Sequence, residues 1–127
     1  MNTNTFNNPM NTCGFEFLEF TTPEPETMEK LFFALGFTAI AKHRSKAVTL
    51  YRQGDINFII NSEPAGFAKE FRDQHGPSAC ALGFRVDNAG DAFNKAIEMG
   101  IEPYDSLPNF MELRLPAVKG VGGSTLF

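Results

Sequence analysis

The sequence has few of the residues on which disulfide bonds and metal sites depend. Its 127 residues include two cysteines, two histidines and no tryptophan. Cys13 and Cys80 are far apart, and neither belongs to a C-x-x-C pair. One disulfide is arithmetically possible, but two isolated thiols suit a reducing compartment better than a secreted, disulfide-stabilised scaffold. We therefore expect both cysteines to be free and buried.

The sequence also lacks an excess of positive charge and a long apolar run. The net charge is -4, so electrostatics give no reason to expect nucleic acid or an anionic membrane as a partner. No apolar run approaches the ~20 residues that span a bilayer. The polar N-terminus MNTNTFNNPMNT has no signal-peptide pattern. These observations predict a cytoplasmic location with no nucleic-acid and no membrane partner.

Apolar residues make up 43% of the sequence, and fourteen residues are phenylalanine. Phenylalanine is therefore expected to fill most of the hydrophobic core. The length suits one domain. Residues 1–13, rich in Asn and Thr, are predicted to be a flexible lead, and residues 14–127 a single domain.

The first half of the domain alternates between strand and helix periodicity. Alternating Phe and Glu predict a strand from Gly14, and apolar residues at helical spacing predict a helix from Pro25 to Gly36. Three strands should follow, at Phe37–His43, Val48–Arg52 and Ile56–Asn61. Residues 14–62 thus form one repeat. A connecting segment with a helix over Glu63–His75 occupies residues 63–77 and is closed by Gly76-Pro77.

The same order then restarts in residues 78–127. A strand at Ala79–Val86 precedes a helix that is capped by Asp87-Asn88 and stopped by Gly100. Further strands are predicted at Ile101–Tyr104, Met111–Leu115 and Val121–Phe127. The sequence therefore predicts an α+β fold of two tandem βαβββ modules. The second module is expected to be truncated at the C-terminus, because Phe127 ends the chain inside an apolar strand pattern.

Two histidines and a carboxylate are the donor set that non-haem iron requires. Here that set would have to combine His43 and His75 with a carboxylate such as Glu16 or Glu112. His43 has cationic neighbours that oppose cation binding, and His75 lies in a helix-ending turn where it can help satisfy the terminal carbonyls. We therefore predict ordinary structural roles for both histidines and no metal site.

The remaining candidates also favour structural roles. Glu16 and Glu19 are three apart on a strand and should point to opposite faces, one exposed and one near a domain contact, rather than act as an acid–base pair. Lys119-Gly120-Val121-Gly122-Gly123 lacks phosphate-loop spacing and precedes a strand, which indicates a turn. Lys42-His43-Arg44-Lys46 reads as a solvated hairpin face. The cysteines have no neighbouring histidine that would activate them. The sequence thus predicts no catalytic, cofactor-binding or metal-binding residue.

The paired strand–helix–three-strand order resembles the vicinal oxygen chelate fold. Five stretches resemble, in order and at similar spacing, the N-terminal domain of bacterial 4-hydroxyphenylpyruvate dioxygenases. They are Gly14-Phe15-Glu16-Phe17, His43-Arg44-Ser45-Lys46, Leu50-Tyr51-Arg52-Gln53-Gly54, His75-Gly76-Pro77-Ser78 and Leu115-Pro116-Ala117-Val118-Lys119-Gly120-Val121-Gly122-Gly123. The resemblance covers essentially everything after residue 10.

The resemblance implies a specific parent enzyme. Members of this family convert 4-hydroxyphenylpyruvate to homogentisate in tyrosine catabolism, with iron(II) held by two His and one Glu of a C-terminal domain. No ligand has a matching position here. The chain is thus expected to be a non-catalytic N-terminal domain, inactive alone, that pairs with that catalytic domain and forms a homo-oligomer. Some bacterial relatives are linked to brown pigment and named haemolysins.

Two other readings stay open at this stage. One is a free-standing glyoxalase-like binding protein or enzyme, with a pocket in the concavity of the same curved sheet. The other is an interaction module that dimerises through an exposed strand edge.

Overall fold

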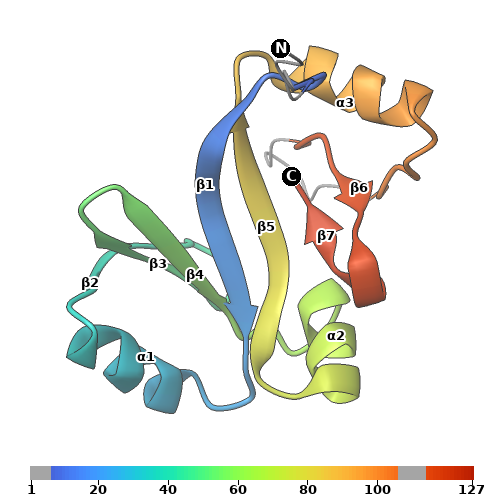
Figure 1. Ribbon diagram of the computed structural model, residues 1–127. Coiled ribbons are helices and arrows are strands. Elements are labelled where there is room, and N and C mark those ends of the chain that lie inside the picture. Colours follow the sequence, from blue (N-terminus) through green and yellow to red (C-terminus); the bar gives the residue numbers. More distant parts are fainter. Residues whose placement is uncertain (1–6, 106–113) are drawn as a thin grey trace, which may run out of the picture.

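A computed structural model describes residues 7–105 and 114–127 (Figure 1). Its elements are β1 (Thr12–Thr21), α1 (Pro25–Ala34), β2 (Thr38–Lys42), β3 (Val48–Gln53), β4 (Ile56–Asn61), α2 (Phe67–His75), β5 (Ser78–Val86), α3 (Ala89–Glu98), β6 (Val118–Lys119), the 3-10 turn η1 (Val121–Gly123) and β7 (Thr125–Leu126). The strands form one mixed sheet in the order β2-β3-β4-β1-β5-β7-β6. None of the described helices is long and apolar enough to cross a membrane.

The sheet consists of two similar halves joined by the antiparallel pair β1–β5, which runs through the centre of the molecule (Figure 1). In the first half β1 lies parallel to β4, and β4, β3 and β2 continue antiparallel. In the second half β5 lies parallel to β7, β7 pairs antiparallel with β6, and a single bridge joins Val118 to Pro103. The predicted fold class of two βαβββ modules is therefore confirmed.

The first half has a core of aromatic rings between α1 and the sheet. Phe32 of α1 is 3% exposed and packs edge-on against Phe20, with 5.4 Å between ring centroids. Phe37 stacks on Phe58 at 4.4 Å, and the buried hydroxyl of Tyr51 donates to Glu29. Phenylalanine thus fills this core, as its abundance in the sequence predicts.

The second buried cluster lies where α2 meets the central strands. Ala68 of α2 contacts Cys80 and Ala81 of β5, and Phe67, Phe71 and Phe127 pack around them. Two polar contacts tie α2 to the first half as well. The Thr21 hydroxyl donates to the Ala68 carbonyl at 3.0 Å, and Arg72 Nη1 donates to the same hydroxyl at 3.2 Å. Because α2 touches β1 and β5 together, it connects the two halves.

The element boundaries differ from the predicted ones at several places. β1 begins at Thr12, and α2 begins only at Phe67, after the Pro64–Gly66 segment. The predicted strand over Ile101–Tyr104 is reduced to one bridge at Pro103, since proline has no N–H to donate to a ladder.

The predicted strand over Val121–Phe127 was also too long. Residues 121–123 form a 3-10 turn in which Gly122 and Gly123 have positive φ angles, and only Thr125–Leu126 is assigned to a strand. Of the strand expected at Met111–Leu115, residues 111–113 lie outside the described residues, and Leu115 is not in a strand.

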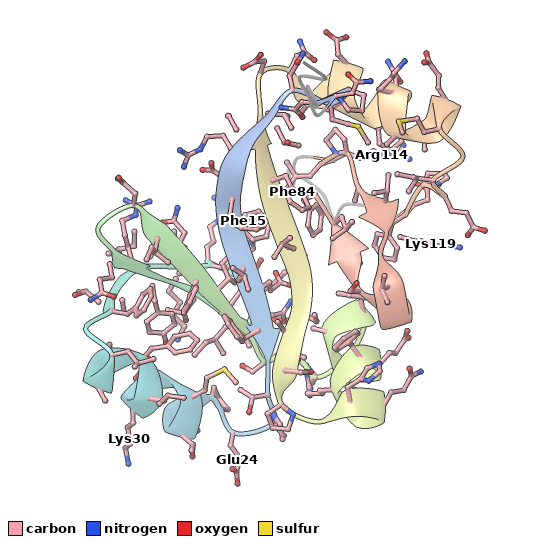
Figure 2. All side chains as sticks on the ribbon, viewed as in Figure 1. Phe15, Glu24, Lys30, Phe84, Arg114 and Lys119 are labelled. Atoms are coloured by element: carbon pink, nitrogen blue, oxygen red, sulfur yellow. The ribbon has the colours of Figure 1, made fainter. Side chains whose placement is uncertain are left out.

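Irregular pairing between β1 and β5 changes the environment of the first aromatic residues. The register shifts between Phe15 and Phe17, and Phe15 is 61% exposed beside Phe84 (Figure 2). The ring of Phe17 lies directly over Gly83, where an added Cβ would come within 2.4 Å of the ring. Glycine at position 83 therefore lets the aromatic ring approach the backbone of β5.

Phe32→Ala should reduce the free energy of unfolding by roughly 3–5 kcal/mol, because it removes a buried ring from a tightly packed core. Urea denaturation should still show one transition, since both halves share a sheet. The sequence predicts the same loss for Phe84→Ala if that side chain is buried, but Phe84 is only partly buried and borders a cavity, so a smaller loss is expected. Two separate transitions, only one of them shifted by Phe32→Ala, would contradict the shared core.

Candidate functional site

Three central strands bring polar side chains together beneath α2. Glu19 lies on β1, Asn61 on β4 and Cys80 on β5. The Cys80 thiol lies 3.5 Å from Glu19 Oε2 and 3.6 Å from the Glu19 carbonyl oxygen, and it donates toward both. Since Glu19 pairs with Ala81 while Phe20 pairs with Ala79, Cys80 is the extra residue of a β-bulge. The bulge places a thiol beside a half-buried carboxylate.

Burial raises the pKa of Glu19, and hydrogen bonds from Cys80 and Asn61 together with the charge of Lys46 offset part of that rise. Burial also raises the pKa of the Cys80 thiol, and the neighbouring Glu19 carboxylate raises it further. A thiol in these surroundings stays protonated and serves as a hydrogen-bond donor, because a nucleophilic cysteine needs a lowered pKa. This arrangement agrees with the predicted filler role of Cys80.

Arg72 of α2 contributes a positive charge near Cys80. Its Nη1 donates to the Thr21 hydroxyl, and its Nη2 donates to the Glu63 carbonyl at 2.6 Å. The first bond joins the connecting segment to β1, and the second lies within the connecting segment. Glu19, Cys80 and Arg72 therefore form a polar cluster where α2 meets the sheet. The Cys80 thiol and the Arg72 guanidinium both donate hydrogen bonds to other groups of the protein.

The two histidines occupy opposite ends of the strand order. His43 follows β2 at one edge of the sheet, and its Nδ1 accepts hydrogen bonds from the backbone N–H groups of Ser45 and Lys46 at 3.2 and 3.1 Å. His75 ends α2, its ring lies tilted against that of Phe71 with 4.3 Å between the ring centroids, and its Nε2 bonds to the Gly122 carbonyl at 3.0 Å. That carbonyl belongs to the β6–β7 turn, so His75 does not satisfy the end of its own helix as predicted. The described histidines cannot share one metal ion.

The carboxylates considered with them do not complete a metal site either. Glu16 forms an exposed ion pair with Arg85, with Oε2 2.8 Å from Nε, and Glu112 lies outside the described residues. Within residues 7–105 and 114–127, no three His, Cys, Asp or Glu side chains are placed to hold a metal ion. One of the two carboxylates is exposed, as predicted: it is Glu16, whereas Glu19 is partly buried. The expected domain contact of the second carboxylate stays a prediction. These residues do not fit the facial triad of a non-haem iron.

The other candidate motifs lie apart from one another. Lys42, His43 and Arg44 are exposed on the β2–β3 hairpin, as predicted, whereas Lys46 is only partly exposed and its charge acts on Glu19. Residues 120–123 form the β6–β7 turn, as expected, and Lys119 ends β6. Cys13 is free but exposed, so its predicted burial was wrong. At that end β1 pairs with β5 alone, because its pairing with β4 starts only at Leu18.

The feature that sequence reasoning missed is an apolar cavity of about 270 Å³ between α3 and the strands β5, β6 and β7. Ala92, Ala96 and Ala117 border it, and so does Phe127, the last residue of the sequence. The alanines of α3 were the available signal, but a pattern of apolar residues does not reveal how completely their side chains fill a volume.

The sheet of two βαβββ modules defines a protein of the vicinal oxygen chelate class. Methylmalonyl-CoA epimerase from Mycobacterium tuberculosis has the same fold, with a TM-score of 0.67 at 11% identity over 96% of this chain and 90% of that one. A mutant of 4-hydroxymandelate synthase from Streptomyces coelicolor gives a TM-score of 0.73 at 20% identity, over 92% of this chain and 38% of that one. At these identities the likeness establishes the fold alone.

Sequence comparison identifies the family. The profile described as "Hydroxyphenylpyruvate dioxygenase, HPPD, N-terminal" matches residues 6–127, and the chain belongs to this family. It is 48% identical to 4-hydroxyphenylpyruvate dioxygenase of Pseudomonas sp. (strain P.J. 874), over 96% of this chain and 34% of that protein. It is 49% identical to Hemolysin VllY of Vibrio vulnificus, over 94% of this chain and 34% of that protein.

A solved structure agrees with this assignment. A xylose isomerase-like TIM barrel/4-hydroxyphenylpyruvate dioxygenase fusion protein has a TM-score of 0.83 at 39% identity, over 96% of this chain and 20% of that one. The chain spans about a third of the length of the dioxygenase relatives. The family resemblance seen in the sequence is thereby confirmed.

Glu19→Gln should stabilise the protein at pH 8 and have little effect at pH 4.5. The raised pKa of Glu19 means that the folded state holds its proton more tightly than the unfolded state, so this residue costs stability as pH rises from its ordinary value of 4.5. Glutamine removes that cost and can still accept from Cys80. Urea denaturation at the two pH values measures the difference.

The matched control for this experiment is Glu16→Gln, in the exposed ion pair with Arg85, which should change stability little. A Glu19→Gln variant that is less stable than wild type at pH 8 would show that the carboxylate contributes net stability.

Proposed function

We propose that this chain is a non-catalytic N-terminal domain of an enzyme that converts 4-hydroxyphenylpyruvate to homogentisate with iron(II). The observation that carries the proposal is the match of nearly the whole chain to the N-terminal third of 4-hydroxyphenylpyruvate dioxygenases. The described side chains support it, because both histidines and Glu16 are engaged in structural contacts. The iron and its chemistry would belong to a C-terminal catalytic domain.

The role of the domain in such an enzyme would be to support that partner. The β1–β5 pairing and the cluster where α2 meets these strands hold the two modules as one body, which presents fixed surfaces to a neighbouring domain. Glu102 and Lys119 show how the second module is braced: their ion pair at 2.7 Å joins the segment before β6 to β6, and it lowers the pKa of Glu102.

A second candidate follows from relatives named 3-dehydroshikimate dehydratase. One from Pseudomonas aeruginosa is 43% identical over 94% of this chain and only 19% of that protein. A domain of this family can therefore stand within a different and longer enzyme. The two Pseudomonas dioxygenases, at 48% and 49% identity, favour the first candidate.

The chain alone should not turn over 4-hydroxyphenylpyruvate. Oxygen-electrode measurements with iron(II) and ascorbate should show no consumption above a heat-killed control, and calorimetry should show only weak, nonspecific iron binding. The physical reason is that the described histidines lie at opposite edges of the sheet. A single tight iron site that is lost in His43→Ala or His75→Ala, or measurable turnover, would refute the non-catalytic assignment.

A chimera tests the supporting role directly. This chain should replace the matching third of the 4-hydroxyphenylpyruvate dioxygenase of Pseudomonas aeruginosa, to which it is 49% identical over 123 residues, with turnover retained within about tenfold. The same chimera carrying Phe32→Ala should lose thermal stability. A folded chimera without turnover, alongside an active chimera built on the dehydratase, would instead favour the second candidate.

The isolated chain should also self-associate, in keeping with the proposed homo-oligomer. Leu31 of α1 and Leu35, the residue that caps its C-terminal end, are 56% and 55% exposed, and the edge strand β2 exposes Ile40. Analytical ultracentrifugation should show a concentration-dependent dimer that Leu31→Glu weakens. Val121→Glu, at the β6–β7 turn, serves as the control. A strict monomer at every concentration would defeat this prediction.

A further inference from the structure

A groove of about 390 Å³ lies between α2 and the turn that joins β6 to β7 (Figure 1). This turn is closed by paired strands, because β6 precedes it and β7 follows it in antiparallel register. The side chains that border the groove include Phe67, Glu70, Phe71, Gln74, Tyr104 and Lys119. The groove thus combines aromatic rings with charged and polar groups, and its volume lies in the range of small-molecule sites.

Hydrogen bonds hold the walls of the groove in place. The Tyr104 N–H donates to the Ala117 carbonyl at 2.9 Å and fixes the segment that carries the Tyr104 ring. His75, at the end of α2, bonds through Nε2 to the Gly122 carbonyl at 3.0 Å, and this bond connects the helix to the turn. A ligand would therefore meet a largely preformed site and would not have to order a loop.

Three aromatic rings form a row along one wall. Phe67 meets Tyr104 edge to face with 5.6 Å between the ring centroids, and the ring of Phe71 lies 6.0 Å from that of Phe67. All three side chains are partly buried and also border the groove. The face of an aromatic ring is negatively polarised and attracts a cation within about 6 Å of the ring centre.

Glu70 of α2 adds a full negative charge beside these rings. Burial raises the pKa of the Tyr104 phenol, and the charges of Glu70 and Glu19 raise it further. In the described parts of the chain, no hydrogen bond or ion pair engages the Glu70 carboxylate. The phenol is therefore neutral at ordinary pH, and the carboxylate is available to a ligand in the groove.

Lys119 carries the positive charge among the side chains that border the groove, and it already has a partner. Its Nζ donates to Glu102 Oε2 at 2.7 Å. Glu70 and Glu102 together with Lys119 leave one negative charge uncompensated. An anion would be repelled by this charge and by the ring faces, whereas both attract a cation.

We propose that the groove between α2 and the β6–β7 turn binds a small organic ammonium ion. Its charged group lies against the rings of Phe67, Phe71 and Tyr104, and Glu70 balances the charge. A substituted ammonium suits the rings better than a metal ion does, because its apolar substituents also cover aromatic surface. This binding goes beyond the supporting role proposed for the domain and does not depend on it.

Titration of the full chain with choline, followed by NMR signals of the aromatic side chains, tests the proposal. Saturable shifts are expected at Phe67, Phe71 and Tyr104. The neutral alcohol in which carbon replaces the nitrogen of choline has the same shape without the charge, and it should bind about tenfold more weakly. The absence of saturable shifts with choline, or equal binding of the neutral alcohol, overturns the proposal.

Two variants locate the site. Glu70→Gln, at an exposed helix position where substitutions perturb folding little, should reduce choline affinity about tenfold. Phe71→Leu removes a ring but keeps an apolar side chain, and it should also weaken binding. The matched control is Glu26→Gln, which makes the same change of charge at an exposed position of α1 and should leave affinity unchanged. Unchanged affinity in Glu70→Gln, or an equal loss in Glu26→Gln, overturns the assignment.

Discussion

The antiparallel pairing of β1 with β5 is the interaction on which the rest of the molecule depends. It joins the two modules into one sheet, and each of its strands then pairs in parallel with the last strand of its own module. Neither module can bury both faces of its few strands alone, so this seam, covered by α2, makes one folding unit from two small ones. The bulge at Cys80 lies within the same seam, and through it the pairing also sets the surroundings of the Glu19 carboxylate.

Much of the architecture could be predicted because it is local. Helical spacing of apolar residues, Asn88 as a helix cap and glycines after both repeat helices specify α1 and α3 without tertiary information. The repeat of element order then gives two modules. Pairing irregularities could not be predicted, since a register shift depends on both partner strands at once. The exposure of Cys13 and the approach of Cys80 to Glu19 were therefore missed.

In the candidate site, too, some features could be predicted from the sequence and others depend on the tertiary fold. Sequence alone indicated that two histidines in unrelated settings do not make an iron triad, and the structure gives each described histidine a specific structural partner. The positions of those partners could not be foreseen: His75 reaches the β6–β7 turn, because α2 packs alongside β5 in the second half. A lone histidine near a turn is satisfied by whichever carbonyl the tertiary fold brings within reach, and local sequence does not identify it.

The difference between the halves shows how a repeated fold can divide its roles. A core position filled by Phe32 gives the first module dense aromatic packing, and this packing supports stability. The same hydrogen-bond pattern ends α3 after Ala96, whose side chain contributes far less volume than that of Phe32. The sheet differs as well: β1 pairs with β4 over four residue pairs, whereas β5 pairs with β7 over two, at Ala81–Thr125 and Leu82–Leu126. The pocket in the second module therefore reflects both a smaller helix side chain and a shorter strand.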